Sequence, residues 1–181
     1  MPTPRVNSDE LQTAFDAYLR RRGPTSPVKT FAALVATGKY LKGTTLETRF
    51  KETLKAGRPD QNKEYLSRLD RQRHVRQLLI DLMDREKIDA LVYPVKSLAG
   101  PAIGSSDDGP RDNNISAVTG LPAIVLPAGM NAAGLPIAIE LLGRPFSEPR
   151  LMELAYAYEQ ASGARVAPPT TPPLSGDVFK F

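Results

Sequence analysis

The apolar positions divide the chain into a helical first part and a second part built on strands. As far as about residue 87, apolar side chains recur every three or four residues, which is the spacing of one face of a helix. From residue 88 onwards they stand in short continuous runs that Gly and Pro interrupt, as buried strands do. The pattern predicts an α/β protein in which helices come first and a small sheet follows.

Two helices are expected before residue 44. Ser8, followed by two acidic residues, suits the start of the first helix, and Gly23-Pro24 suits its end. Ser26-Pro27 is expected to open the second helix. The apolar face of this second helix would carry Phe31, Leu34, Val35 and Leu41.

A third helix over residues 44–58 and a long fourth helix are expected next. Gly57-Arg58-Pro59 should end the third helix, because glycine and proline both disfavour its continuation. The fourth should run from about Asp60 to Lys87, with one apolar stripe opposite a heavily charged face. The stripe consists of Tyr65, Leu69, Val75, Leu78, Leu79 and Leu82.

Three strands are expected, at residues 88–95, 123–129 and 135–142. The short turn between the last two contains Asn131 and Gly134, which predicts an antiparallel hairpin within a small mixed sheet. Pro127 and Gly129 are expected to end the middle strand. Residues 96–112 are rich in Gly, Ser, Pro and Asp and predict a surface loop. A sheet of this size has an edge that needs a cover or a partner strand.

One further helix and a proline-rich tail complete the expected organisation. Ser147 should cap this helix, which would run to about Ala161 with Gly163 just beyond its end. Its inner face would carry Leu151, Leu154, Ala155 and Tyr158. We predict a single domain over residues 1–181, with a helical part at 9–87, a strand, hairpin and helix part at 88–163, and an extended tail at 164–181.

Composition narrows the class of protein. The net charge is +4, and the basic residues are spread along helices without interleaved aromatic residues, so nucleic-acid binding is not expected. The absence of cysteine excludes a disulfide framework and a thiolate nucleophile. The amino terminus does not have the pattern of a signal peptide, and no apolar run is long enough to span a bilayer. A cytoplasmic protein without a cofactor or metal ion is therefore expected.

The segment from residue 112 to residue 146 carries a specific resemblance. Asp112-Asn113-Asn114 leads through Thr119-Gly120-Leu121-Pro122-Ala123 to a strand that ends in Pro127-Ala128-Gly129. The next strand leaves through Gly143-Arg144-Pro145. This arrangement resembles the amidase-signature family of hydrolases.

The resemblance extends beyond that segment in both directions. Ile88–Pro94 resembles a strand of the family and Phe15–Leu19 one of its helices, while Tyr158-Glu159 fits its last helix. The likeness is specific over about 86–163 and looser over 9–85. It implies a partial amidase-signature fold, and it identifies this chain with the carboxyl-terminal portion of such a hydrolase.

The resemblance also implies that the chemistry lies elsewhere. Amidase-signature enzymes hydrolyse amides with a serine nucleophile, a second serine held by a cis peptide, and a lysine. In that family these groups precede the region that resembles this chain. We therefore expect this chain to have no catalytic residue of its own and to be inactive alone, and the residues that bind substrate are unknown.

Other candidate sites within the chain are expected to be structural. Ser105, Ser106 and Lys96 could form a relocated serine and lysine pair, but their loop lacks the dense glycine context of an oxyanion site. Asp107-Asp108 is expected to be solvated rather than to bind a cation. His74, which is the single histidine, is expected on a helix surface.

Glu140 is a charged residue on an otherwise apolar strand. If its side chain faces the core it needs a partner, because a buried unpaired charge is costly. Arg144, or an arginine on the long helix, is the expected partner. This pair is predicted to be structural.

Two roles remain open at this point. The chain could complete an amidase whose amino-terminal half carries the serines and the lysine. It could instead be a non-catalytic derivative of the family that acts as an oligomeric binding or structural protein and covers its open surface by forming a homodimer. A basic helical module for an acidic partner is a weaker third reading.

Overall fold

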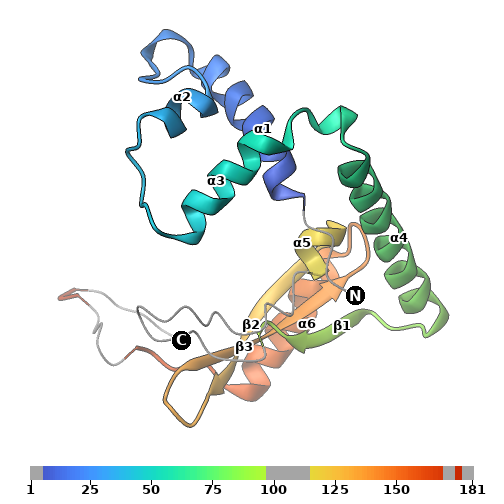
Figure 1. Cartoon of the computed structure of the whole chain (residues 1–181). Coiled ribbons are helices and arrows are strands. Elements are labelled where there is room, and N and C mark those ends of the chain that lie inside the picture. Colours follow the sequence, from blue (N-terminus) through green and yellow to red (C-terminus); the bar gives the residue numbers. More distant parts are fainter. Residues whose placement is uncertain (1–5, 97–114, 169–173, 177–181) are drawn as a thin grey trace. The chain divides into compact units, whose positions relative to one another are not determined.

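The computed structural model describes residues 6–96, 115–168 and 174–176. The chain divides into two compact units, one over Met1–Leu79 and one over Ile80–Phe181 (Figure 1). We call them the helical unit and the sheet unit. The α/β class is confirmed, with helices before the sheet. Whether the two units act as one domain stays a prediction.

The helical unit consists of short helices joined by tight turns. Its elements are α1 (Asn7–Arg22), the 3₁₀ turn η1 (Gly23–Thr25), α2 (Phe31–Ala36), α3 (Thr45–Ala56), the 3₁₀ turn η2 (Pro59–Gln61) and most of α4 (Lys63–Arg85). The predicted ends at Gly23 and Gly57 are confirmed. Both glycines have a φ of about 70°, a conformation that other residues rarely adopt.

The predicted start of the second helix is wrong. Thr30 caps α2, and its Oγ1 accepts a hydrogen bond of 3.0 Å from the Ala33 N–H. The Ser26 hydroxyl instead donates to the Val28 carbonyl, which closes a turn ahead of the helix. Leu41 lies outside α2 and is 69% exposed, so it does not share the apolar face of that helix.

Aromatic rings form the core of the helical unit. Phe31 is 1% exposed and lies edge-to-face against Phe15 and Phe50, with ring centroids 5.8 Å and 5.2 Å away. Tyr40 also packs against Phe50, with ring centroids 5.2 Å apart. Such pairs stabilise a core beyond the burial of their area, so a small helical unit can be held by few side chains.

The long helix α4 is only partly covered. The stripe predicted to be buried is at most half-buried, since Leu78 on it is 53% exposed, and Leu66, outside the stripe, is 46% exposed. Met83, which the stripe did not include, is the fully buried residue of this helix. No helix of the described residues is both long and apolar enough to cross a membrane.

The sheet unit is built on three strands. They are β1 (Ala90–Pro94), β2 (Ala123–Met130) and β3 (Pro136–Gly143), in the spatial order β1-β3-β2, and the short helix α5 (Ile115–Thr119) precedes β2. The hairpin of β2 and β3 is confirmed. The expected mixed sheet is not seen among the described strands, because β3 lies between β1 and β2 and pairs antiparallel with both.

Strand β2 continues past Pro127 and Gly129, the residues expected to end it. Pro127 and Gly129 both pair with β3, and the register shifts between them, so the extra residue Ala128 forms a bulge. Gly129 has a φ of 106°, which suits this bulge. The hairpin turn is closed by the Asn131 Oδ1, which accepts hydrogen bonds from the backbone of Ala133 and Leu135 at 3.0 and 2.9 Å.

The last helix, α6 (Glu148–Ser162), covers one face of the sheet (Figure 1). Leu151 and Ala155 on α6 pack with Leu126 and Leu141 from the two hairpin strands, and the predicted inner-face residues Leu154 and Tyr158 lie against this core. Gly163 ends α6 in the left-handed conformation, as predicted. Ser147 precedes the helix but donates its hydroxyl to the Arg144 carbonyl instead of capping α6.

Candidate functional site

A partly buried tyrosine and a buried glutamate pair on the face of the sheet that α6 does not cover. Register places Tyr93, Glu140 and Val125 opposite one another on β1, β3 and β2, so their side chains share one face. The Tyr93 hydroxyl donates a short hydrogen bond to the Glu140 Oε1. Glu140 is only 6% exposed, so this bond supplies a hydrogen-bond donor to a buried carboxylate.

Burial and the Glu140 carboxylate both raise the pKa of the Tyr93 phenol. Burial is the larger cause that raises the pKa of Tyr93 above its usual value, and the hydrogen bond to Glu140 adds to the rise. A contact with Ser116 on α5 acts in the opposite direction on this pKa. At neutral pH the phenol therefore stays protonated and remains a hydrogen-bond donor, and the pair offers neither a free nucleophile nor a solvent-facing base.

The predicted partner of Glu140 is wrong, and Arg144 has a different role. Its Nε donates to the Asp84 carboxylate and its Nη2 to the Met83 carbonyl, each at 2.6 Å. Both acceptors belong to the last turn of α4, where a cation is favoured by the negative end of the helix dipole. Tyr93 was missed as the partner because three strands had to be aligned before its position opposite Glu140 could be known.

A second polar network lies in the helical unit. Asp9 on α1 is buried and accepts hydrogen bonds from Arg68 Nη2 at 2.6 and 2.7 Å and from Asn62 Nδ2 at 3.2 Å. Beside it, the Tyr65 hydroxyl donates to the Glu10 Oε1 at 2.8 Å. This hydrogen bond is the leading cause that raises the pKa of Tyr65. The network ties the start of α1 to the first turns of α4.

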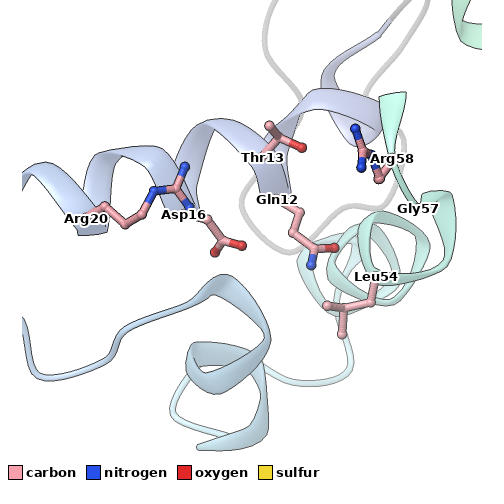
Figure 2. A pocket seen from close by; sticks show the side chains of 7 residues that line it. All are labelled: Gln12, Thr13, Asp16, Arg20, Leu54, Gly57 and Arg58. Atoms are coloured by element: carbon pink, nitrogen blue, oxygen red, sulfur yellow. The ribbon is translucent and has the colours of Figure 1, made fainter. Parts of the chain in front are cut away.

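A groove of about 360 Å³ lies along α1 and the end of α3 (Figure 2). We call it the α1–α3 groove. Its residues are Gln12, Thr13, Asp16 and Arg20 on α1, Leu54 on α3, and Gly57 and Arg58 just after α3. Asp16 also holds the start of α2, because its Oδ1 accepts a hydrogen bond of 2.6 Å from the Phe31 N–H. No pattern in the sequence had indicated this groove.

Two other residues considered from the sequence are described by the structure. His74 is exposed on α4, and Lys96 follows β1. Ser105, Ser106, Asp107 and Asp108 lie outside the described residues. Within the described ranges, no group of three or more histidine, aspartate or glutamate side chains could hold a metal ion.

Comparison with known families and proteins gives a consistent match. The family model described as Amidase matches residues 13–152. The A subunit of the glutamyl-tRNA(Gln) amidotransferase from Parvibaculum lavamentivorans is 39% identical over 89 residues, which is 45% of this chain and 18% of that protein. The corresponding protein of Afipia carboxidovorans is 43% identical over 86 residues, which is 42% of this chain and 17% of that protein.

Solved structures of amidases also match this chain, and they cover a larger share of it. The native peptide amidase of Stenotrophomonas maltophilia superposes with a TM-score of 0.71 and 26% identity, covering 88% of this chain and 33% of that one. An amidase family protein of Bacillus anthracis superposes with a TM-score of 0.66 at 22% identity, over 88% of this chain and 29% of that one, which shows the shared fold alone. The chain thus spans about a third or less of these relatives.

Proposed function

The chain belongs to the amidase family, and from that membership we propose that it is the carboxyl-terminal part of an enzyme that hydrolyses amide bonds. In this proposal the catalytic serines and lysine lie in a separate segment, and the 181 residues are inactive alone. The observation that carries the proposal is the coverage. Nearly the whole chain superposes on a peptide amidase, yet it spans only 33% of that protein.

Exposed apolar side chains support the proposal that a partner segment covers part of this surface. Val92 on the edge strand β1 is 61% exposed and Val125 on β2 is 52% exposed. Leu78 is similarly exposed on α4. Edge strands and apolar helix faces are usually covered in a stable fold, so surfaces of this kind favour a missing partner segment.

The buried pair fits a structural part within that enzyme. Tyr93 and Glu140 satisfy each other and offer no group that could attack a carbonyl. In the proposed enzyme this chain would contribute strands and supporting side chains, while a partner segment, the amino-terminal part of an amidase, would contribute the nucleophile.

The first test is an assay of the purified chain with an amidated peptide as substrate. We expect no release of ammonia above the rate with buffer alone. The variants Ser105→Ala and Ser106→Ala serve as controls for a relocated nucleophile. Turnover by the chain that either substitution abolishes would show a complete site here and overturn the proposal.

The second test measures the exposed surface and the mass in solution. We expect an environment-sensitive dye to bind the chain, and Leu78→Ser to reduce that binding. A homodimer that does not bind the dye would favour the alternative, in which a non-catalytic derivative covers its surfaces with a second copy. A monomer that does not bind the dye would contradict both readings.

A further inference from the structure

The α1–α3 groove carries functional groups that the fold does not use. In the part of the chain that the structure describes, the side chains of Arg20, Gln12 and Thr13 make no hydrogen bond or ion pair. Arg58 differs, because Asp60 engages its Nε and Nη2 at 3.1 and 2.7 Å. Among the described residues, the groove therefore presents one cation that makes no ion pair, Arg20, and one carboxylate, Asp16, on the same face of α1.

We propose that the α1–α3 groove binds a dipeptide-sized ligand, with Arg20 holding its carboxylate and Asp16 its amino group. The inference does not rest on the proposed amide hydrolysis, because it uses only contacts and charges of the helical unit. A guanidinium is well matched to a carboxylate, since its planar donors can form two parallel hydrogen bonds.

The spacing along α1 fits a ligand of this length. Asp16 and Arg20 are four residues apart on one helix face, which corresponds to about 6 Å along the axis. An extended dipeptide places its amino and carboxylate groups about 7 Å apart. Asp16 retains acceptor capacity for an ammonium group, because only its Oδ1 is engaged by the Phe31 N–H.

The rest of the groove selects the amino-terminal side chain of the ligand. Gln12 lies one turn further along α1 from Asp16, and Figure 2 shows it extending toward Leu54 on α3. Leu54 is 38% exposed and offers an apolar surface, while the Gln12 amide can both donate and accept. An amino-terminal leucine followed by a small residue therefore matches the groove.

The volume of the α1–α3 groove and its exposure to solvent determine how tightly the ligand is expected to bind. At about 360 Å³ the groove is near the lower end of the range of small-ligand sites. Its groups are reached by solvent, and exposed ion pairs stabilise weakly, so the dissociation constant should be on the order of millimolar.

The test is a titration of the ¹⁵N-labelled 181-residue chain with leucyl-glycine, followed by two-dimensional NMR. We expect saturable shifts confined to the amides of residues 12–20 and 54–58. Arg20→Ala and replacement of the probe by leucyl-glycinamide, which lacks the carboxylate, should each weaken binding about fivefold. Arg21→Ala, which removes an equal charge beside the groove, should leave binding unchanged.

Four results would overturn the proposal. Three of them are the absence of saturable shifts up to the solubility of the probe, shifts that lie outside the two named ranges, and equal binding by the wild-type chain and Arg20→Ala. The fourth is equal weakening by Arg21→Ala, which would show that only the general charge of the surface is sensed. Circular dichroism of each variant establishes that the fold is retained, since both arginines are exposed.

Discussion

The two units contain the same interaction in different surroundings. In the helical unit Tyr65 donates to Glu10 near the surface, and the hydrogen bond is the leading cause of its raised pKa. In the sheet unit Tyr93 donates to Glu140, and burial leads. The hydrogen bond between Tyr65 and Glu10 links two helices, whereas the bond between Tyr93 and Glu140 supplies a donor to a carboxylate buried in the sheet.

The difference extends to how each unit is held together. The helical unit depends on a small group of aromatic rings and on the network around Asp9. The sheet unit depends on aliphatic side chains between α6 and the hairpin. A polar contact therefore matters in proportion to the buried polar group that its removal leaves unsatisfied.

The largest effects should come from the two cores. Phe31→Ala should lower the free energy of unfolding by about 3–5 kcal/mol and Leu142→Ala by about 2–5 kcal/mol, because both side chains are fully buried. Hydrogen exchange with mass spectrometry measures protection in each unit separately. If the units are independent, Phe31→Ala reduces protection in the helical unit only and Leu142→Ala in the sheet unit only.

The control for these substitutions is Leu41→Ala, at an exposed position, which should change stability by less than about 0.5 kcal/mol. Loss of protection in both units from either core substitution would show that the two units unfold together.

Removal of the buried carboxylate in the helical unit should have the next largest effect. Asp9→Ala takes two short hydrogen bonds from Arg68, so we expect a loss of about 1.5–3 kcal/mol. Asp70→Ala removes an exposed ion pair with Arg73 and should produce no measurable change. Urea unfolding of both variants would test this, and equal losses would contradict the role given to burial.

Gly143 tests the packing of the sheet unit. A Cβ added there would clash with the Ser147 Oγ and lie 3.1 Å from the Leu151 Cδ1, so Gly143→Ala should cost about 1–3 kcal/mol. The double variant Gly143→Ala/Ser147→Ala removes the shortest contact and should be less destabilised than the sum of the two single variants. Strict additivity in thermal unfolding would argue against a clash as the cause.

The tyrosine pairs should give the smallest and most diagnostic effect. Tyr93→Phe leaves Glu140 without its hydroxyl donor and should cost about 1–2 kcal/mol at pH 8. Tyr65→Phe should cost less, because water can replace the donor to Glu10. Urea unfolding measures both losses of free energy. A loss for Tyr65→Phe equal to or above that for Tyr93→Phe would contradict the larger role given to the pair in the sheet.

The same pair predicts the direction of an alkaline effect. The pKa of Tyr93 is raised in the folded state, so its contribution is complete below the ordinary tyrosine value of 10.0 and is lost as the pH rises beyond it. Stability measured between pH 9 and pH 11 should therefore fall less steeply in Tyr93→Phe than in the wild type. A wild-type slope that is unchanged by Tyr93→Phe would show that the pair does not titrate with unfolding.

Local patterns predicted most of the elements and few of the contacts. Gly23, Gly57 and Gly163 mark helix ends in the sequence, because a residue with positive φ at a helix end is usually glycine. The start of α2 was misplaced because Ser26 and Thr30 are both good capping residues, and only the path of the chain decides between them. Pro127 and Gly129 predict a strand end where the structure has a bulge, because a bulge and a strand end use the same residues.

The candidate sites were less accessible to prediction. That Glu140 needed a partner followed from one charged residue in an apolar strand, but the choice of Tyr93 over Arg144 depended on the order β1-β3-β2. The α1–α3 groove unites residues from α1 with residues near position 57, and no local pattern connects them.

The class of fold, the helix and hairpin positions and the amidase resemblance can be predicted from the amino-acid sequence, because they rest on periodicity and on short runs of neighbouring residues. Which polar groups meet follows only from the folded structure. Partners such as Tyr93 with Glu140, Arg144 with Asp84, and Asp9 with Arg68 are separated by 47, 60 and 59 residues. Their pairing depends on strand order and helix packing, which arise from burial summed over each unit rather than from any local segment.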